Sequence, residues 1–521
     1  MVGRKEVMIN YGSWLPRLHN ALTIALLGLL LGTCAPSYMV PSSGQFDSRF
    51  SRQVLQAAFD GILDYHIQKS SPRELAVWSL EGLEKLDPSL QVDADPRRLT
   101  LRRRNGNTAY LSLPADNDVS GWLTTTVDGI VLARELSPTL ADLGGEKIID
   151  HMLTSMLQNF DRFSRYKNAA AADNSRAARH GFTGIGVSIE KTPDGVRIVT
   201  VYDAGPAAAA GLVEEDIFIA VDDVDTRQAT PQEVAKLVRG RNGTEVRITM
   251  LRGEDIKRFT ITRRPVVPQS VKLRRQDGFA IVRLTSFNKG TTKALRQAIR
   301  QDSRQNGKPL GLILDLRGNR GGLLNQAIDV SDLFLGSGKI LITDGRNFRA
   351  KQRFTAEDAE LAYGVPMAVL IDQRSASATE VLAAALQDNK RALLIGSRTF
   401  GKGTVQTVIR LPDGGEMTVT WARMFAPSGY ALSTYGVFPD ICIINLASDN
   451  AGNPSAVRSA SAEAMQLLDQ RRNSANLSEA KQQALLASCG PKTLSTANGD
   501  EALSIAKTIL GNPSIANIPT Q

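Results

Sequence analysis

The strongest constraint on the fold is an alternation of apolar and helical segments between residues 265 and 445. Three segments begin with an uninterrupted apolar run: LGLILDLRGN, MAVLIDQRS and ALLIGS. A helical segment that contains TTKALRQ precedes the first of them, and helical segments that contain NQAIDV and ATEVLAAAL stand between them. Strands that are apolar on both faces belong to parallel sheets covered by helices on both sides. We therefore predict an α/β domain whose functional loops lie at the carboxyl ends of its strands.

Three other regions flank this domain. Residues 44–166 are predicted to be mostly helical, with one hairpin whose turn is Asn105-Gly106. Residues 182–264 change to short strands rich in Val and Ile, together with the capped helix TPQEVAKLVRG. Residues 446–521 are rich in Ser, Ala, Asn and Gln. For them we expect weak helices near 459–472 and 478–488, followed by a loose tail.

The amino terminus predicts export. Basic residues precede the apolar run Ala21–Cys34, which is shorter than the roughly 20 residues that span a bilayer. Residues 1–35 are therefore predicted to be an export signal, and LGTC resembles a lipoprotein cleavage site with Cys34 as the lipidated residue. An uncleaved membrane anchor is the alternative. The expected location is the periplasm or cell envelope, with membrane attachment through a lipid on Cys34.

Charge, cysteine and histidine content narrow the function classes. The net charge is +9, but Arg and Lys are scattered, so we expect no nucleic-acid partner. An oxidising compartment permits a disulfide between Cys442 and Cys489, and two separate buried thiols are the alternative. The four histidines show no metal-ligand spacing and none lies near the motifs below in the sequence. We expect neither a metal nor a cofactor.

The stretch LLIGSRTFGKGTVQ matches part of a phosphate-binding loop. Gly396, Gly401 and Lys402 fit that pattern, but Gly403 stands where Ser or Thr would ligate magnesium. Such a loop also requires a helix directly after the lysine. The following residues, TVQTVIRLPDGGEMTVTW, alternate and contain a turn, which predicts a β-hairpin. A nucleotide-dependent enzyme is disfavoured, and Lys402 needs another role.

A second stretch, DQRSASATEVLAAAL, supplies a partner for Lys402. It ends a buried strand and enters a helix, whose first N–H groups stabilise an oxyanion. No histidine is within reach by sequence logic, so a buried lysine is the candidate base, because desolvation lowers its pKa. On spacing alone, a role as helix N-caps explains Ser375 and Ser377 at least as well as a role as the nucleophile.

Several motifs together resemble the carboxyl-terminal processing, or tail-specific, serine peptidase family. They run in the family's order from about residue 147 to 445, and are FDRFSRY, LDLRGNRGGLL, SASATE, TFGKGTVQ and GVFPDI. The resemblance implies an α/β protease core with a ClpP/crotonase-like β-sheet and covering helices, an inserted β-rich PDZ domain and a helical N-terminal region. In the predicted PDZ domain, GIGV resembles the carboxylate-binding loop, and a tight turn entering an ordinary strand is the alternative. That loop consists of Gly184, Ile185, Gly186 and Val187.

The resemblance also implies roles for individual residues. Ser377 is the nucleophile, Lys402 the general base and Gln406 the residue that orients the lysine, since positions four apart on a strand share a face. The Ala378 N–H and an N–H from Gly321 or Gly322 would form the oxyanion hole. Asp388, about 16 Å along the helix from the serine, is interpreted as structural. Thr379 and Arg320 depart from the Ser and Pro that are usual at their positions.

We thus predict an exported serine endopeptidase that captures protein C-termini through its PDZ domain and cleaves envelope or periplasmic proteins. A catalytically silent peptide-binding scaffold or adaptor of the same fold is the alternative. The intact Ser377, Lys402 and Gln406 argue against it. A homodimer and an adaptor or activator protein are further expected partners.

Overall fold

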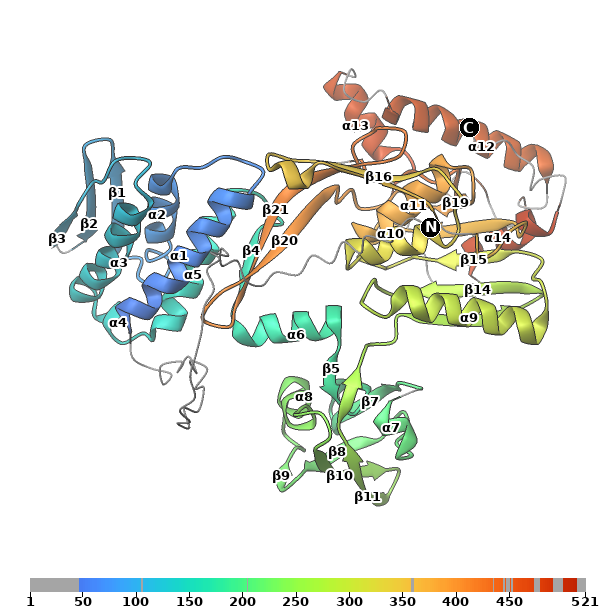
Figure 1. The fold of residues 1–521 in the computed structure, drawn as a ribbon, viewed down its shortest axis with the longest axis horizontal. Helices are drawn as coiled ribbons and strands as arrows, with labels where there is room; N and C mark the ends of the chain where they lie inside the picture. Colours follow the sequence, from blue (N-terminus) through green and yellow to red (C-terminus); the bar gives the residue numbers. More distant parts are fainter. Residues whose placement is uncertain are drawn as a thin grey trace, which may run out of the picture. The chain divides into compact units, whose positions relative to one another are not determined.

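The computed structural model describes most of residues 46–512 (Figure 1). The residues inside that range that it does not describe are 105, 204, 358–359, 434, 444–445, 447–449, 451–452, 473–477 and 491–499. The predicted export signal, with Cys34, lies outside the described residues. Within them, none of the helices is long and apolar enough to cross a membrane.

The α/β domain is built on a six-stranded sheet with the order β13-β14-β15-β18-β19-β22. All neighbours from β14 to β22 are parallel, and β13 pairs antiparallel at one edge. The predicted parallel sheet is therefore confirmed. The strands are β13 (Val271–Gln276), β14 (Phe279–Leu284), β15 (Leu312–Asp315), β18 (Met367–Ile371), β19 (Leu393–Gly396) and β22 (Ile441–Cys442).

Helices cover both faces of this sheet. Leu312 and Leu314 point into one core and Ile313, between them, into the other, so β15 is apolar on both sides. The first core is closed by α9 (Thr291–Asn306), α10 (Leu324–Asp332) and α11 (Ala378–Asp388). The second is closed by α12 (Pro454–Arg472) and α14 (Glu501–Gly511).

The expectation of a loose tail after residue 488 is wrong for α14. Its residues Leu503, Ile505 and Ile509 are buried against the sheet, because their spacing gives the helix one apolar face. The preceding helix, α13 (Glu479–Ala487), leads to Cys489, which forms a disulfide with Cys442 at a Cα–Cα distance of 5.8 Å. Of the two alternatives for these cysteines, the structure thus shows the disulfide.

A long hairpin connects the α/β domain to the N-terminal region. It comprises β20 and β21, as predicted, and β21 also pairs with β4 and β16. Near the tip of the hairpin, Leu411 and Met417 are buried in the helical core of the N-terminal region. The bounds in this sheet are β4 (Arg165–Lys167), β16 (Lys339–Asp344), β17 (Gln352–Thr355), β20 (Thr404–Arg410) and β21 (Glu416–Phe425), with the 3-10 helix η1 (Phe348–Ala350) between β16 and β17.

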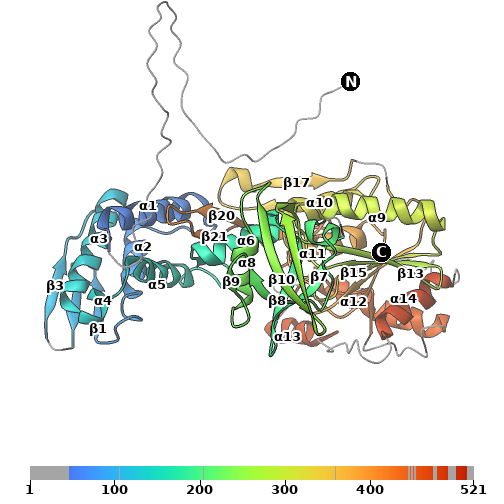
Figure 2. The ribbon, with the colours of Figure 1, turned by 90° about the horizontal axis from the view of Figure 1, so that it is seen from below.

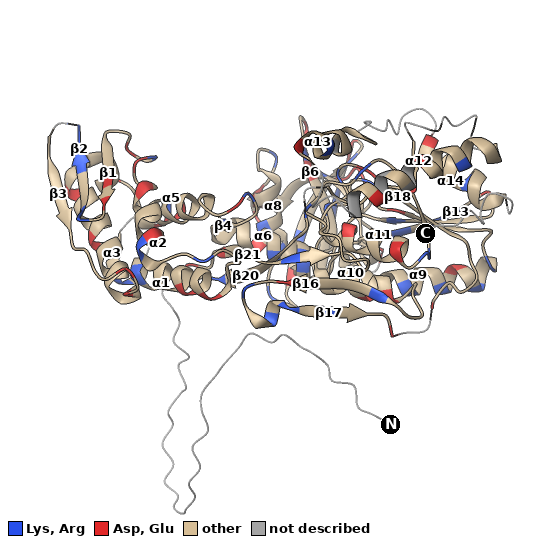
Figure 3. Cartoon of the chain, turned by 90° about the horizontal axis from the view of Figure 1, so that it is seen from above, with Lys and Arg blue, Asp and Glu red and all other residues tan. Residues whose placement is uncertain are grey.

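The N-terminal region is mostly helical and carries a three-stranded sheet, β1-β2-β3. The predicted hairpin is present between β2 and β3, and Gly106 in its turn has φ +96°. The elements are α1 (Ser48–Tyr65), α2 (Pro72–Glu81), β1 (Leu90–Asp95), β2 (Arg98–Arg103), β3 (Thr108–Leu111), α3 (Val119–Leu136), α4 (Pro138–Ala141) and α5 (Gly145–Gln158). Acidic and basic side chains are interspersed over the chain, which agrees with their scatter in the sequence (Figure 3).

The predicted PDZ region has its own sheet, with the order β11-β10-β8-β7-β6, and its own apolar core (Figure 2). The short strands β5 and β12 pair where the chain enters and leaves it. Helix α6 (Ala169–His180) precedes it. Its elements are β5 (Phe182–Gly184), β6 (Val187–Thr192), β7 (Gly195–Val201), α7 (Pro206–Ala209), β8 (Ile217–Val221), β9 (Val224–Asp225), α8 (Pro231–Val238), β10 (Glu245–Arg252), β11 (Asp255–Thr262) and β12 (Arg264–Val266).

The burial of α14 predicts that it contributes to stability. Ile505→Ala should lower the free energy of unfolding by about 2–5 kcal/mol, because it leaves a cavity under the sheet. Ser504→Ala, on the exposed side of the same helix, should change it by less than ~0.5 kcal/mol. Denaturant unfolding followed by circular dichroism measures both. Equal effects of the two substitutions would contradict the packing described.

Candidate active site

Ser377 occupies the junction between β18 and α11, which agrees with the strand-to-helix junction that the sequence predicts. Its backbone has φ +59° and ψ −117°, which is uncommon for a residue with a side chain. Such strain persists only where the surrounding structure holds it, and it is frequent at functional positions. Ser377 is half-buried and forms a capping box with Glu380 at the start of α11, but its hydroxyl donates to no acceptor among the described residues. The hydroxyl is therefore available to a substrate.

Ser375, the other candidate, is in a different situation. Its side chain is fully buried, and its Oγ donates to the Leu316 carbonyl at 2.9 Å. The same oxygen accepts the Asp372 N–H at 3.0 Å. The Ser375 hydroxyl is thus engaged in hydrogen bonds that hold the loop, whereas Ser377 is only half-buried. The geometry therefore favours Ser377 as the nucleophile.

The glycine loop after β15 lies directly against this serine. A Cβ on Gly321 would lie 3.0 Å from the Ser377 Cβ and 2.7 Å from the Ala376 carbonyl oxygen. Its φ of +94° also favours glycine. Asn319 shapes the loop, because its Oδ1 accepts the Gly321 N–H at 2.9 Å and its carbonyl accepts the Thr379 hydroxyl at 2.9 Å. The Ser-to-Thr departure at Thr379 therefore keeps a hydroxyl that holds the loop.

Two N–H groups beside Ser377 are candidates for an oxyanion hole. Those of Ala378 and Gly322 have no acceptor among the described residues. The Gly321 N–H, in contrast, is already bonded to Asn319. Gly322 is exposed and Ala378 opens α11, where the helix dipole favours negative charge. Of the two glycines left open by the sequence, the geometry favours Gly322.

Lys402 is held in a half-buried position beside an aromatic ring. Its Nζ lies 5.1 Å from the centre of the Phe163 ring. Burial, together with the positive charge of Arg165, lowers the pKa of Lys402 to about 8, although Glu380 and Asp161 oppose the shift. A lysine with this pKa is partly neutral near physiological pH and can act as a base.

The surroundings of Lys402 include groups that its own segment does not supply. The carboxylates of Glu380 and Asp161, which influence its pKa, come from segments distant in the sequence. Lys402 also lies before β20 begins at Thr404, so strand alternation does not relate it to Gln406. The Gln406 amide donates to Thr404 Oγ1 at 2.7 Å. Among the described residues no hydrogen bond joins Lys402 Nζ to Ser377 or Gln406, and the orienting role of Gln406 stays a prediction.

Glu380 was not predicted as a functional residue, although it lies within SASATE. Its carboxylate is buried and accepts four hydrogen bonds. One oxygen accepts the N–H groups of Ser377 at 2.7 Å and Lys402 at 2.9 Å. The other accepts the Gly401 N–H at 2.7 Å and the Thr399 hydroxyl at 2.6 Å. Burial raises the pKa of Glu380, while these donors oppose the rise. One carboxylate thereby joins the serine loop to the lysine loop.

The FDRFSRY motif supplies the wall behind Lys402 and corrects an expectation about histidine. His66 Nε2 lies 3.2 Å from Asp161 Oδ2, and its ring packs on Phe160 with a centroid distance of 4.1 Å. Although burial opposes it, hydrogen bonds from His66 and Ser164 lower the pKa of Asp161. A histidine distant in sequence therefore lies against one of the motifs. Sequence spacing could not show this contact.

A groove runs along the predicted carboxylate loop of the PDZ region. Its volume is about 250 Å³, and Ile185, Gly186 and Val187 line it. The C-terminal end of α8 and residues Ala177 and Ala178 of α6 form other walls. Gly184 lies just outside it and pairs with Arg264.

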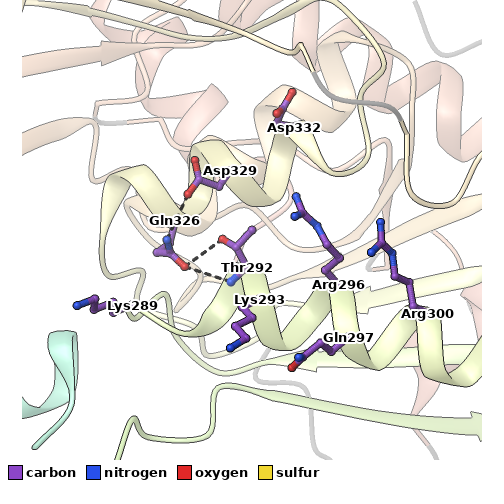
Figure 4. Close-up of a pocket in the computed structure, with 9 residues that line it drawn as sticks. All are labelled: Lys289, Thr292, Lys293, Arg296, Gln297, Arg300, Gln326, Asp329 and Asp332. Atoms are coloured by element: carbon purple, nitrogen blue, oxygen red, sulfur yellow. Dashed lines mark hydrogen bonds between the residues drawn. The ribbon is translucent and has the colours of Figure 1, made fainter. Parts of the chain in front are cut away.

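A separate cavity of about 510 Å³ lies between α9 and α10, and none of the predicted site residues is among those that line it (Figure 4). Gln326 on α10 accepts both the N–H and the hydroxyl of Thr292 at its floor. Its lining is mixed in charge, from Lys289, Lys293, Arg296, Arg300, Asp329 and Asp332. In the described part of the chain, no group of three or more His, Cys, Asp or Glu is placed to hold a metal ion.

Comparisons with known proteins agree with this arrangement. Residues 278–443 match the model of peptidase family S41, and residues 197–252 match that of the PDZ domain. The carboxy-terminal-processing protease of Bartonella bacilliformis is 36% identical over 340 residues, which are 64% of this chain and 78% of that protein. The carboxyl-terminal-processing protease of Synechocystis is 34% identical over 299 residues, 56% of this chain and 69% of that protein.

Solved structures include the photosystem II D1 C-terminal processing protease. It is 25% identical with a TM-score of 0.37, over 75% of this chain and 92% of that one. The PDZ domain of the Vibrio cholerae carboxy-terminal protease, in complex with a peptide, is 31% identical with a TM-score of 0.16, over 16% of this chain and 96% of that one.

The α/β core with its PDZ domain is that of a serine peptidase that handles peptide C-termini. The chain belongs to peptidase family S41, among the carboxyl-terminal-processing proteases. The family, the fold class and the enzyme class predicted from the sequence are confirmed.

The lowered pKa of Lys402 predicts a pH dependence. The value of kcat/KM should rise with unit slope up to a midpoint near pH 8 and then level off, because only the neutral amine accepts a proton. In the unfolded chain this lysine binds its proton more tightly. Its contribution to the free energy of unfolding therefore rises with pH from about 8 to 10.5 and is constant below and above.

Two substitutions check the assignment. Lys402→Arg should be inactive at every pH, since arginine keeps its proton. Arg165→Gln should move the midpoint to higher pH, because a positive neighbour is removed. Rates of peptide cleavage between pH 5.5 and 10 measure both. Turnover by the Lys402→Arg protein within a few-fold of normal would exclude the lysine as the base.

Proposed function

We propose that this peptidase is an exported endopeptidase with a Ser377–Lys402 catalytic dyad that cleaves envelope or periplasmic proteins captured by their C-terminal tails. The observation that carries the proposal is the bridging carboxylate of Glu380, which holds the strained serine and the low-pKa lysine in adjacent loops. The two unbonded N–H groups beside the serine support it further. The groove of the PDZ domain is the proposed site for the substrate's tail.

The proposed reaction is acyl transfer through a serine ester. The neutral Lys402 amine takes the hydroxyl proton of Ser377 while Oγ attacks the peptide carbonyl carbon. The Ala378 and Gly322 N–H groups hold the oxyanion that forms. The tetrahedral intermediate collapses, and Lys402 returns the proton to the departing amine. A water molecule, deprotonated by Lys402, then attacks the carbonyl carbon of the serine ester. The bond to Oγ breaks, the carboxylic acid product leaves, and Lys402 returns the proton to Ser377 Oγ.

Two observations support the proposed location. The amino terminus carries the predicted export signal, with Cys34 as a candidate for lipid attachment to a membrane. The disulfide between Cys442 and Cys489 suits an oxidising compartment such as the periplasm. An adaptor or activator protein and a homodimer remain proposals that rest on the family alone.

The nucleophile has a direct test. Incubation with a peptide substrate followed by rapid acid quench should give an acyl adduct that mass spectrometry locates on the peptide containing Ser377. Ser377→Ala should abolish both adduct and cleavage, by roughly 10³-fold or more in kcat. Ser375→Ala should keep the adduct on Ser377 even if the rate falls. An adduct that persists in Ser377→Ala would contradict the assignment. A wild-type protein that forms no adduct and cleaves no peptide would favour the scaffold alternative.

The PDZ groove has a test of its own. Peptides with an apolar C-terminus and a free carboxylate should bind the Ser377→Ala protein, because backbone N–H groups of the Gly186 loop can donate hydrogen bonds to the carboxylate. Amidation of that C-terminus should weaken binding by roughly tenfold or more, since the charge is lost. Fluorescence anisotropy with the paired acid and amide peptides measures the difference. Equal affinities would show that the groove does not read the carboxylate.

A further inference from the structure

Arg317, in the LDLRGN motif, is held by a carboxylate from the C-terminal segment. The buried guanidinium donates from both terminal nitrogens to the two oxygens of Asp500, each at 2.6 Å. It also donates to both oxygens of Asp315, at 2.8 and 2.9 Å. Arg283 contacts Asp315 as well, at 2.6 Å, so Asp315 is shared. A bidentate, largely buried ion pair of this kind fixes both the position and the orientation of the Arg317 guanidinium.

The position of Arg317 gives this pair a connection to catalysis. Arg317 is the second residue after β15, and it opens the turn that ends at Gly322, whose N–H is proposed for the oxyanion hole. The turn is also fixed by the Gly318 N–H, which donates to Asp372 at 2.8 Å. Without Asp500, one side of a desolvated guanidinium would lack its acceptor, which is costly in a buried place. The turn would then be free to reorient toward water.

A second contact joins the same C-terminal segment to the lysine loop. The Cys489 carbonyl accepts the Arg398 N–H at 3.3 Å, four residues before Lys402. Cys489 is linked by its disulfide to Cys442, which pairs in register with Gly396 at the end of β19. Cys489 thus contacts the loop that carries Lys402, and Asp500 contacts the turn that ends at Gly322.

The position of Asp500 is itself set by packing. Asp500 is the N-cap of α14, and its Oδ1 accepts the Leu503 N–H at 3.2 Å. The apolar face of α14 is buried on the sheet, so the carboxylate is presented at a fixed place. We infer that Asp500, at the start of α14, is a positioning residue that acts through Arg317 on the oxyanion loop, the turn from Arg317 to Gly322. This inference rests on the proposed function of Ser377 and Gly322.

The test compares Asp500→Asn with a matched control. Asn keeps the N-cap but loses the charge that pairs with Arg317. The control, Asp277→Asn, removes another ion pair of α14, because Asp277 contacts Lys507 at 2.7 Å far from the turn in sequence. We expect Asp500→Asn to lower kcat by roughly 10- to 100-fold while KM changes less than about twofold. Asp277→Asn should leave both within twofold, and Asp500→Glu should recover part of kcat.

A second readout does not depend on activity. In the Ser377→Ala background, hydrogen exchange of the peptide that covers residues 317–324 should become faster with Asp500→Asn and stay unchanged with Asp277→Asn. If the proposed function fails, the wild-type protein is inactive but this difference in exchange remains. Unchanged exchange in that peptide, or a kcat loss no larger than that of the control, would overturn the inference. Should Asp500→Asn not fold, Asp500→Ser, which also keeps an N-cap but removes the charge, replaces it in the same two measurements, and no change in either would refute the inference.

Discussion

The buried carboxylate of Glu380 is the interaction on which the geometry of this site depends. A carboxylate removed from water is costly unless donors replace the lost hydration, and four donors do so here. Because the donors come from two loops, neither loop can move away without leaving the charge unsatisfied. The strained backbone of Ser377 and the half-buried position of Lys402 are held by the same group.

Much of the α/β domain could be predicted because its information is local. The strands around Leu314 and Val369 are apolar on both faces, and only a sheet covered on two sides accommodates them. Helix α14 escaped prediction because it follows a segment rich in Ser and Asn, and composition outweighed its apolar spacing. The contact between His66 and Asp161 joins residues far apart in the chain, and no local pattern encodes it.

The candidate site shows the same division between local and tertiary information. Ser377 and Lys402 were predicted from motifs, but spacing alone did not separate Ser377 from Ser375. Ser377 has a positive φ angle, whereas the Ser375 hydroxyl already donates to a backbone carbonyl. Likewise, Gly322 is distinguished from Gly321 only by the acceptor that Asn319 offers. These differences between neighbouring residues depend on tertiary hydrogen bonds, which cannot be read from a single sequence.

The order of the elements along the chain has a consequence for synthesis. All six strands of the large sheet are complete at Cys442, but α14, which covers one of its faces, begins at Glu501. A chain still emerging from the ribosome therefore leaves the apolar side chains of that face in water, where they attract chaperones or other chains. The sheet cannot be covered on both faces until α14 has been made. Packing of this domain is therefore completed only after residue 511 has been added to the chain.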